Sequence, residues 1–348
     1  MNDRDTDRLD GEDGEGLLDK LRGWIDVQAH IDEQMYGLAQ QVVATEAGAL
    51  FDVIDRAVME GDVTPDAIDH GSVFLAPNPY SGAEQEEVLG LLDLLHGEQV
   101  PALTAAFADF AQGHDLFKRV QAGETFIFPS NHLELQDQGF TLGYLHRAAQ
   151  AEGVDRLEHH ITLMIGRLLG YLRLGERSVI DDILRKVGGV LKTFPVSGSE
   201  VMEEGVVTEA DLDRRRKVFR RTATARTRRE VGRLIGSSQG TIVLLAGGGS
   251  RDARDEAGDV FMHPFGKATR SMLANACRSG AWVVPLFVAY GDQISLVEFA
   301  EPTRVTDADG VHHLGEVIAA MGNAQRGMAR VTHPDIERFR SRIFYEPT

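Results

Sequence analysis

The chain has 348 residues, of which 43% are hydrophobic and 26% charged, as is ordinary for a soluble globular protein. Its formal net charge of −18 argues against general nucleic-acid binding, because neutralising phosphates needs a basic surface. The single cysteine, Cys277, excludes an internal disulfide. The N-terminus is neither a signal peptide nor a lipidation motif, and the apolar stretch 161–174 is too short and too charged to span a bilayer. We therefore expect a cytoplasmic protein.

The N-terminal third of the chain is predicted to be helical. Residues 1–14 are rich in aspartate, glutamate and glycine, which indicates a disordered acidic tail. Residues 15–121 carry apolar side chains mostly at helical spacing, with helices expected over 84–95 and 102–120. We expect no strand before Thr125. The pattern therefore predicts a small helical domain over residues 15–121.

Residues 122–348 change to alternating strands and helices. Near-continuous apolar strands that alternate with helices are typical of an α/β sheet that is covered on both faces. We therefore predict an α/β domain with a mixed sheet between helices. The expected strands span residues 125–128, 189–196, 241–245, 282–289 and 294–299, and the expected helices span residues 139–151, 212–235 and 267–279.

The segment after the first of these strands carries the most informative pair of residues. Pro129-Ser130-Asn131 ends the strand, His132 follows, and Asp137 comes five residues later at an expected helix start. A turn into the helix can bring the carboxylate back to one ring nitrogen, which leaves the other nitrogen to accept a proton. His132 and Asp137 would then be a general base and its orienting carboxylate. The alternative is that His132 caps the helix and Asp137 stabilises its first turn through the helix dipole.

A second buried strand leads into the run Ala246-Gly247-Gly248-Gly249-Ser250-Arg251-Asp252. Glycines let backbone amides approach an anion, and an arginine is a forked donor for phosphate, so the run favours an anion site. Neither the Rossmann nor the Walker A spacing of glycines fits it. The alternative is a plain flexible turn.

Two other features are weaker candidates for a site. Gly236-Ser237-Ser238-Gln239-Gly240 matches the nucleophile elbow of serine hydrolases, but a helix is expected before it and a strand after it, which reverses the order that the elbow needs. The pairs His159-His160 and His312-His313 are adjacent in sequence and poorly placed to share one metal ion. We therefore expect neither a serine nucleophile nor a metal site.

Taken together, these segments resemble the H-x4-D glycerolipid acyltransferases. Asn131-His132 and Asp137 are similar to that family's H-x4-D motif, and the stretch 246–252 resembles the glycine-rich arginine motif that follows it. Val284-Pro285-Leu286 is similar to the apolar strand with a proline that comes next. The likeness is strongest to the soluble glycerol-3-phosphate acyltransferases of plastids and covers roughly residues 125–292.

The chain departs from the motifs of the plastid enzymes at two places. Ala253 stands where that type has a second arginine, and Arg254, one residue later, is expected to substitute for it. Residues 197–200 read Ser-Gly-Ser-Glu where a Lys-His pair is expected, although Lys192 lies close by. These departures bear on the identity of the acceptor more than on the reaction class.

The resemblance implies an acyltransferase of phospholipid biosynthesis. It would move a fatty acyl group from an acyl carrier protein or coenzyme A thioester to the sn-1 hydroxyl of glycerol 3-phosphate, giving lysophosphatidate. His132 would be the general base and Asp137 its orienting group. No cofactor other than the acyl donor is expected. The substrate-binding residues implied are Asn131, Lys192, Gly248, Gly249, Ser250, Arg251 and Arg254.

Three rival functions stay open at this point. The acceptor could be lysophosphatidate or another alcohol. The chain could be a serine hydrolase that uses Ser238. It could also be a non-catalytic lipid-binding protein, which would keep the fold and tolerate the loss of His132.

Nine basic residues lie between Arg214 and Arg229 in this otherwise acidic chain, and we call this stretch the cationic segment. It is either a solvated helix face whose arginines pair with carboxylates or a docking patch for an anionic partner. The partners it would suit are an acidic acyl carrier protein and the inner face of a membrane that the enzyme contacts peripherally.

Overall fold

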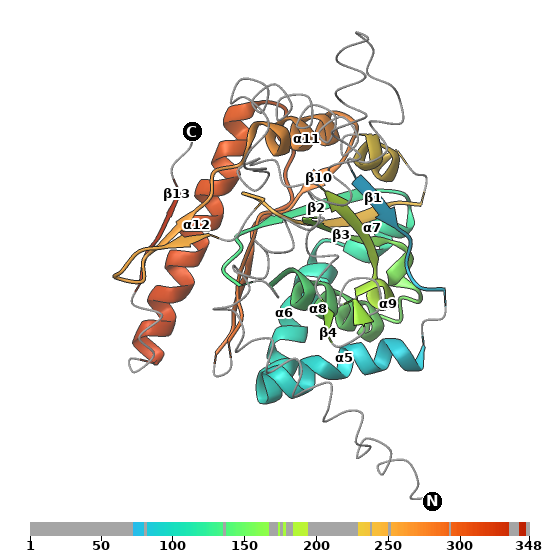
Figure 1. The fold of residues 1–348 in the computed structure, drawn as a ribbon, viewed down its shortest axis with the longest axis horizontal. Coiled ribbons are helices and arrows are strands. Elements are labelled where there is room, and N and C mark those ends of the chain that lie inside the picture. The colour runs from blue at the N-terminus through green and yellow to red at the C-terminus, as the bar shows by residue number, and fades with distance from the viewer. Residues whose placement is uncertain are drawn as a thin grey trace, which may run out of the picture.

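The computed structural model describes residues 72–79, 82–134, 137–166, 173–174, 177–178, 184–193, 229–236, 239–249, 252–291, 294–333 and 341–345. This part of the chain is a mixed α/β structure in which one large sheet lies among helices (Figure 1). The predicted fold class is confirmed at that level. The division into a helical domain and an α/β domain stays a prediction, because residues 15–71 lie outside the described ranges.

Eight strands form the large sheet. They are β1 (Ser72–Leu75), β2 (Thr125–Ser130), β3 (Ile161–Gly166), β6 (Gly189–Thr193), β7 (Thr241–Ala246), β10 (Trp282–Val283), β11 (Leu286–Ala289) and β12 (Leu296–Phe299). Their order is β1–β6–β3–β7–β2–β11–β12, and β10 also pairs with β2. The central strands β6, β3, β7, β2 and β11 run parallel, and the edge strands β1 and β12 run antiparallel to their neighbours. The sheet is therefore mixed, as predicted.

Two small sheets and a set of helices complete the described structure. The small sheets contain β4 (Arg173–Leu174) with β5 (Arg177–Ser178), and β8 (Ala253–Arg254) with β9 (Val260–Met262) and β13 (Ile343–Tyr345). The helices are α5 (Ala83–His96), α6 (Val100–Gly113), α7 (Leu116–Gln121), α8 (Asp137–Ala151), α9 (Arg185–Val187), α11 (Lys267–Arg278) and α12 (Ala308–Thr332). Two single turns of 3-10 helix are η2 (Gly97–Gln99) and η3 (Leu157–His159), and residues 229–235 are also helical.

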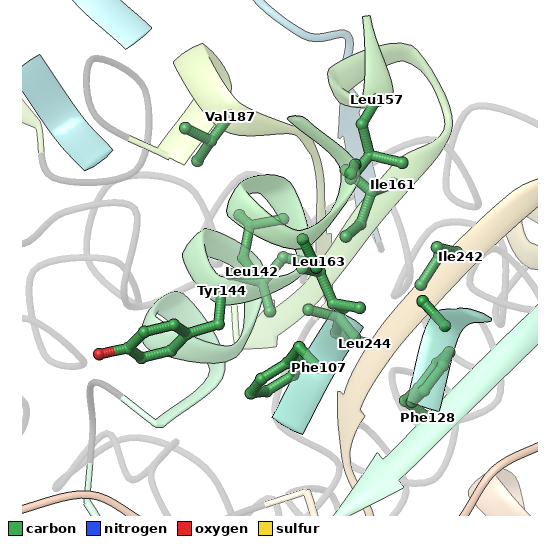
Figure 2. Close-up of a cluster of buried hydrophobic side chains, with 14 of the residues drawn as sticks. Phe107, Phe128, Leu142, Tyr144, Leu157, Ile161, Leu163, Val187, Ile242 and Leu244 are labelled. Carbon is green, nitrogen blue, oxygen red and sulfur yellow. The ribbon is translucent and has the colours of Figure 1, made fainter. Parts of the chain in front are cut away.

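The two faces of the sheet bury separate hydrophobic clusters. In β2, Phe126 and Phe128 belong to one cluster while Ile127 belongs to the other, because successive side chains point to opposite faces of a strand. The first cluster joins the sheet to α5, α6 and α8, and Figure 2 shows part of it, including Phe107 and Tyr144. The second joins the sheet to α11, α12 and the helix over residues 229–235. Burial on both faces explains why the central strands are almost wholly apolar.

The observed elements correct several predicted boundaries. The single helix expected over 102–120 is two helices, because Asp115 adopts the left-handed conformation with φ 50° and breaks the run between α6 and α7. The strand expected over 282–289 is divided into β10 and β11, since Pro285 has no N–H to donate to a ladder. The expectation of no strand before Thr125 is wrong: β1 pairs with β6, which places it at the sheet edge.

The longest of the described helices, α12, was not predicted from the sequence. α12 contains four glycines, which are poor helix formers, and so its periodicity is weak. Two of these glycines are needed for packing. A Cβ on Gly315 would lie 2.3 Å from the ring of Tyr345, and a Cβ on Gly322 would lie 2.5 Å from Ile343, so β13 packs directly against the helix backbone.

Candidate active site

The two predicted site segments leave the sheet side by side. β2 and β7 are parallel neighbours whose last residues, Ser130 and Ala246, are paired. The amide of Gly247 donates to the carbonyl of Ser130 over 2.9 Å, so the contact continues past the strand ends. The carboxyl edge of parallel strands is where open α/β sheets place their ligand sites. The segments that carry His132 and the glycine run therefore meet at the edge where a site is expected.

His132 and Asp137 come together as their spacing predicted. Nδ1 of His132 lies 3.9 Å from Oδ2 of Asp137; the histidine side chain is 12% exposed and the aspartate side chain 0%. Asp137 is the first residue of α8, and its Oδ2 accepts hydrogen bonds of 2.8 Å from the amides of Leu133 and Glu134. The turn between β2 and α8 thus fixes the position of the carboxylate beside the imidazole of His132.

Two polar atoms of this pair are buried and have no hydrogen-bond partner among the described residues. They are Nδ1 of His132 and Oδ1 of Asp137. The distance of 3.9 Å is too long for a hydrogen bond. Catalytic hydrogen bonds are often long in the absence of substrate and tighten in the complex. Burial leaves water little access to either atom, so a hydrogen bond between them would satisfy both groups.

Asn131 ties this loop to the next strand of the sheet. Its side chain donates from Nδ2 to the carbonyl of Val288 over 2.7 Å and accepts at Oδ1 from the amide of Val288 over 2.8 Å. The residue is 1% exposed. These contacts give Asn131 a positioning role between β2 and β11, and a contact to the reacting substrate stays a prediction.

The sequence did not indicate the buried hydroxyl groups behind Asp137. Thr141 donates from Oγ1 to the carbonyl of Asp137 over 2.8 Å, and its Oγ1 lies 3.0 Å from the hydroxyl of Tyr290. Burial raises the pKa of Tyr290 well above its ordinary value, so this phenol stays protonated. Thr141 follows Asp137 by one helical turn, which is a recognisable signal. Tyr290 comes from the end of β11, and no spacing in the sequence connects it to Asp137.

Packing explains two of the three glycines in the run. A Cβ on Gly247 would lie 1.9 Å from the ring of Phe265, and a Cβ on Gly248 would lie 2.4 Å from Cβ of His263. Gly249 has φ 79°, a conformation that other residues rarely adopt. Packing and backbone conformation therefore already require glycine at these three positions, independently of any ligand. Anion binding by Gly248 and Gly249 stays a prediction, and Ser250 and Arg251 lie outside the described residues.

Asp252, at the end of the run, makes direct contact with the histidine loop. Its Oδ2 accepts from the amide of His132 over 2.8 Å, and its own amide donates to the carbonyl of His132 over 2.7 Å. Its Oδ1 accepts from the amide of His263 over 3.0 Å. Burial, only partly opposed by these bonds, raises the pKa of Asp252 to about 6. The sequence indicated this residue only as part of the glycine-rich motif.

The two remaining cationic candidates lie in different sheets. Arg254 in β8 forms an ion pair of 2.9 Å with Glu134, two residues after His132, so it is close to the histidine loop. Lys192 lies in β6, which is separated from β7 by β3, and the structure describes only its backbone. Arg254 is thus near the site but engaged by a carboxylate, while Lys192 starts two strands away from the glycine run.

Other predicted features lie mostly outside the described residues. The cationic segment is described only at Arg229, which is exposed. Ser238 is not described, but the helix over residues 229–235 precedes it and β7 follows it, as expected. Within the described ranges, no group of three or more His, Cys, Asp or Glu side chains is placed to hold a metal ion. None of the helices described is both long and apolar enough to cross a membrane.

Comparisons of the chain with protein-family models, curated proteins and solved structures give no match. The function is therefore inferred from the residues of the site and from their motifs.

Proposed function

We propose that this protein is an O-acyltransferase that moves a fatty acyl group from a thioester to the hydroxyl of a phosphorylated glycerol. The acceptor we propose is the sn-1 hydroxyl of glycerol 3-phosphate, which gives lysophosphatidate. The donor is an acyl carrier protein or coenzyme A thioester. The resemblance of the H-x4-D and glycine-rich segments to glycerolipid acyltransferases supports this choice of substrates.

One observation carries the proposal. A histidine and a buried carboxylate lie 3.9 Å apart at the carboxyl edge of the sheet, and the same loop is hydrogen-bonded to the end of the glycine run. A base, its orienting carboxylate and a turn rich in backbone amides are the three parts that direct acyl transfer to a hydroxyl requires. The base and its carboxylate come from one segment, and the turn comes from another that lies about 115 residues later in the sequence.

The reaction then follows from these groups. His132 takes the proton of the acceptor hydroxyl as the hydroxyl oxygen attacks the thioester carbonyl carbon. Asp137 holds the ring in the required tautomer and stabilises the imidazolium that forms. Backbone amides near Gly248 stabilise the tetrahedral oxyanion, and Arg251 binds the acceptor phosphate. The carbon–sulfur bond breaks as the intermediate collapses, and the departing thiolate takes the proton from His132.

The rival functions are separated by simple measurements. A serine hydrolase would be labelled at Ser238 by a fluorophosphonate probe, whereas the helix-then-strand order around that residue does not suit a nucleophile elbow. A non-catalytic lipid-binding protein would bind acyl chains equally well after His132→Ala. A lysophosphatidate or alcohol acyltransferase would share the chemistry and differ in the acceptor alone.

The test is an acyl-transfer assay with radiolabelled donors. Acyl carrier protein and coenzyme A thioesters are each combined with glycerol 3-phosphate, dihydroxyacetone phosphate, lysophosphatidate and a plain alcohol. We expect transfer to glycerol 3-phosphate to exceed transfer to the other acceptors. Transfer to lysophosphatidate alone would reassign the acceptor, and no transfer in any combination would overturn the proposed reaction class.

A further inference from the structure

Asp252 connects three segments that are distant in sequence. Its carboxylate accepts the amide of His132, from the loop after β2, and the amide of His263, from the loop between β9 and α11. Its own amide donates to the carbonyl of His132. Both main-chain polar groups of His132, its amide and its carbonyl, are therefore held by a single residue of the glycine-rich turn.

The packing around Asp252 shows that these segments are in close contact. Gly248 packs so tightly against His263 that a side chain would not fit, and the amide of Gly247 donates to Ser130 just before the histidine loop. The three loops thus meet at backbone distance. A displacement of Asp252 would alter the position of the His132 main chain, and the direction of its imidazole with it.

Burial of Asp252 disfavours the ionised form of its carboxyl group. The residue is 9% exposed, and burial raises its pKa to about 6 despite the two amide hydrogen bonds. The titratable groups that face it are His132 and His263, and the Arg254–Glu134 ion pair lies next along the chain. A buried carboxylate with this penalty is expected where its two acceptor oxygens have a specific role.

We propose that Asp252 is a positioning residue of the active site, whose carboxylate holds the main chain of His132 against the glycine-rich turn and the loop that leads into α11. The proposal rests on the proposed function for its effect on catalysis. The carboxylate bridge itself is independent of that function. Protonation of Asp252 turns one of its two acceptor oxygens into a donor and so releases one amide.

The bridge is tested by NMR with backbone ¹⁵N-histidine labelling. The chain has 12 histidines, so the spectrum is simple, and His132→Gln and His263→Gln identify the two relevant amides. In the wild-type protein, both amide protons should shift together with a midpoint near pH 6. Asp252→Asn should remove this component from both amides, while any shift caused by the histidine rings should remain.

Two further variants exclude simpler explanations. In the His132→Gln protein the His263 amide should keep the component near pH 6 that Asp252→Asn removes, so this component does not depend on the His132 side chain. Asp255→Asn is the matched control, because Asp255 also accepts a backbone amide, from Asp259 over 2.8 Å, but on the exposed turn between β8 and β9. It should leave both histidine amides unchanged. If the titration curves of both amides in Asp252→Asn are the same as in the wild-type protein, there is no carboxylate bridge.

The effect on catalysis is measured separately. Asp252→Asn should lower kcat by about 10-fold or more, because a small misplacement of a catalytic group is costly, with little change in the KM of the donor. Asp255→Asn should keep the wild-type rate. An unchanged kcat in Asp252→Asn with the NMR titration abolished would overturn the positioning role. If the wild-type protein transfers no acyl group, the proposed function fails, and the NMR result still decides the bridge.

Discussion

His132 and Asp137 approach to 3.9 Å, and the described residues satisfy the hydrogen-bonding capacity of the two side chains only in part. Oδ2 of Asp137 is already occupied by the amides of Leu133 and Glu134, and Oδ1 has no partner among the described residues. Nδ1 of His132 is likewise buried without a partner in the described part of the chain. A protonated Nδ1 turned toward Oδ1 would satisfy both atoms and leave Nε2 to accept a proton.

The first prediction concerns this pair. His132→Ala should lower kcat by at least about 10²-fold, the low end for the loss of a general base. Asp137→Asn should be similarly damaging because it favours the wrong tautomer, although its amide oxygen can still accept from the turn. Acyl-transfer rates check both values, with circular dichroism to verify the fold. His313→Ala, on the exposed surface of α12, is the control. A variant of the pair that keeps most of the wild-type rate would remove the base assignment.

The second prediction concerns the acceptor phosphate. Arg251→Ala should weaken acceptor binding by roughly 1.5–3 kcal/mol, as for other hydrogen bonds to charged groups, and raise the acceptor KM accordingly. The donor KM should change far less. Arg254→Ala should have a smaller effect, because the Arg254 guanidinium is paired with Glu134. An unchanged acceptor KM in Arg251→Ala would assign the glycine-rich turn another role.

The third prediction concerns the pH dependence of stability. The pKa of Asp252 is raised from 3.8 to about 6 on folding, so the folded protein binds this proton more tightly than the unfolded chain does. The resulting stabilisation is present in acid and is lost as the pH rises through the folded value. Relative to Asp252→Asn, the wild-type free energy of unfolding should fall by about 1 kcal/mol between about pH 5 and about pH 7.5. Urea denaturation of both proteins checks this, and a difference that grows with pH would contradict it.

The fourth prediction concerns the close packing of the glycine-rich turn. Gly247→Ala should destabilise the protein by about 1–3 kcal/mol, because the new Cβ would overlap the fully buried ring of Phe265. Gly327→Ala is the control. Nothing lies within 4 Å of a Cβ there, five residues before the end of α12, so alanine should stabilise that helix by about 0.5–1 kcal/mol. Thermal denaturation measures both effects, and a tolerated Gly247→Ala would mean that the turn can relax.

The fifth prediction concerns the cationic segment, most of which lies outside the described residues. Reversing Arg215, Arg220 and Arg228 to glutamate should lower kcat/KM for acyl carrier protein donors and flatten its dependence on salt. Steering of this kind weakens with ionic strength, since the screening length is about 8 Å at physiological salt. Turnover at a saturating coenzyme A donor should change little. Equal losses with both donors, independent of salt, would indicate a structural role instead.

Much of the central architecture could be predicted because its signals are local. The strands β2 and β7 read as apolar runs since both faces of the sheet are covered, and α8 and α11 were predicted within two residues of their observed bounds. The central strand β3 was not predicted although its residues form an apolar run, and two other missed elements have weak local signals. β1 is a short edge strand, and the glycines of α12 reduce its helical periodicity.

The approach of His132 to Asp137 was encoded locally, because only four residues separate them and the six residues between β2 and α8 leave the chain few ways to turn. The contacts of His132 with Asp252, and of Thr141 with Tyr290, depend on the order of strands in the sheet. A local pattern does not determine that order, since it arises from the packing of distant segments. The sequence by itself therefore determined which residues follow the ends of the strands. Tertiary structure alone decided that β7 and β11 flank β2, and so which residues surround the histidine.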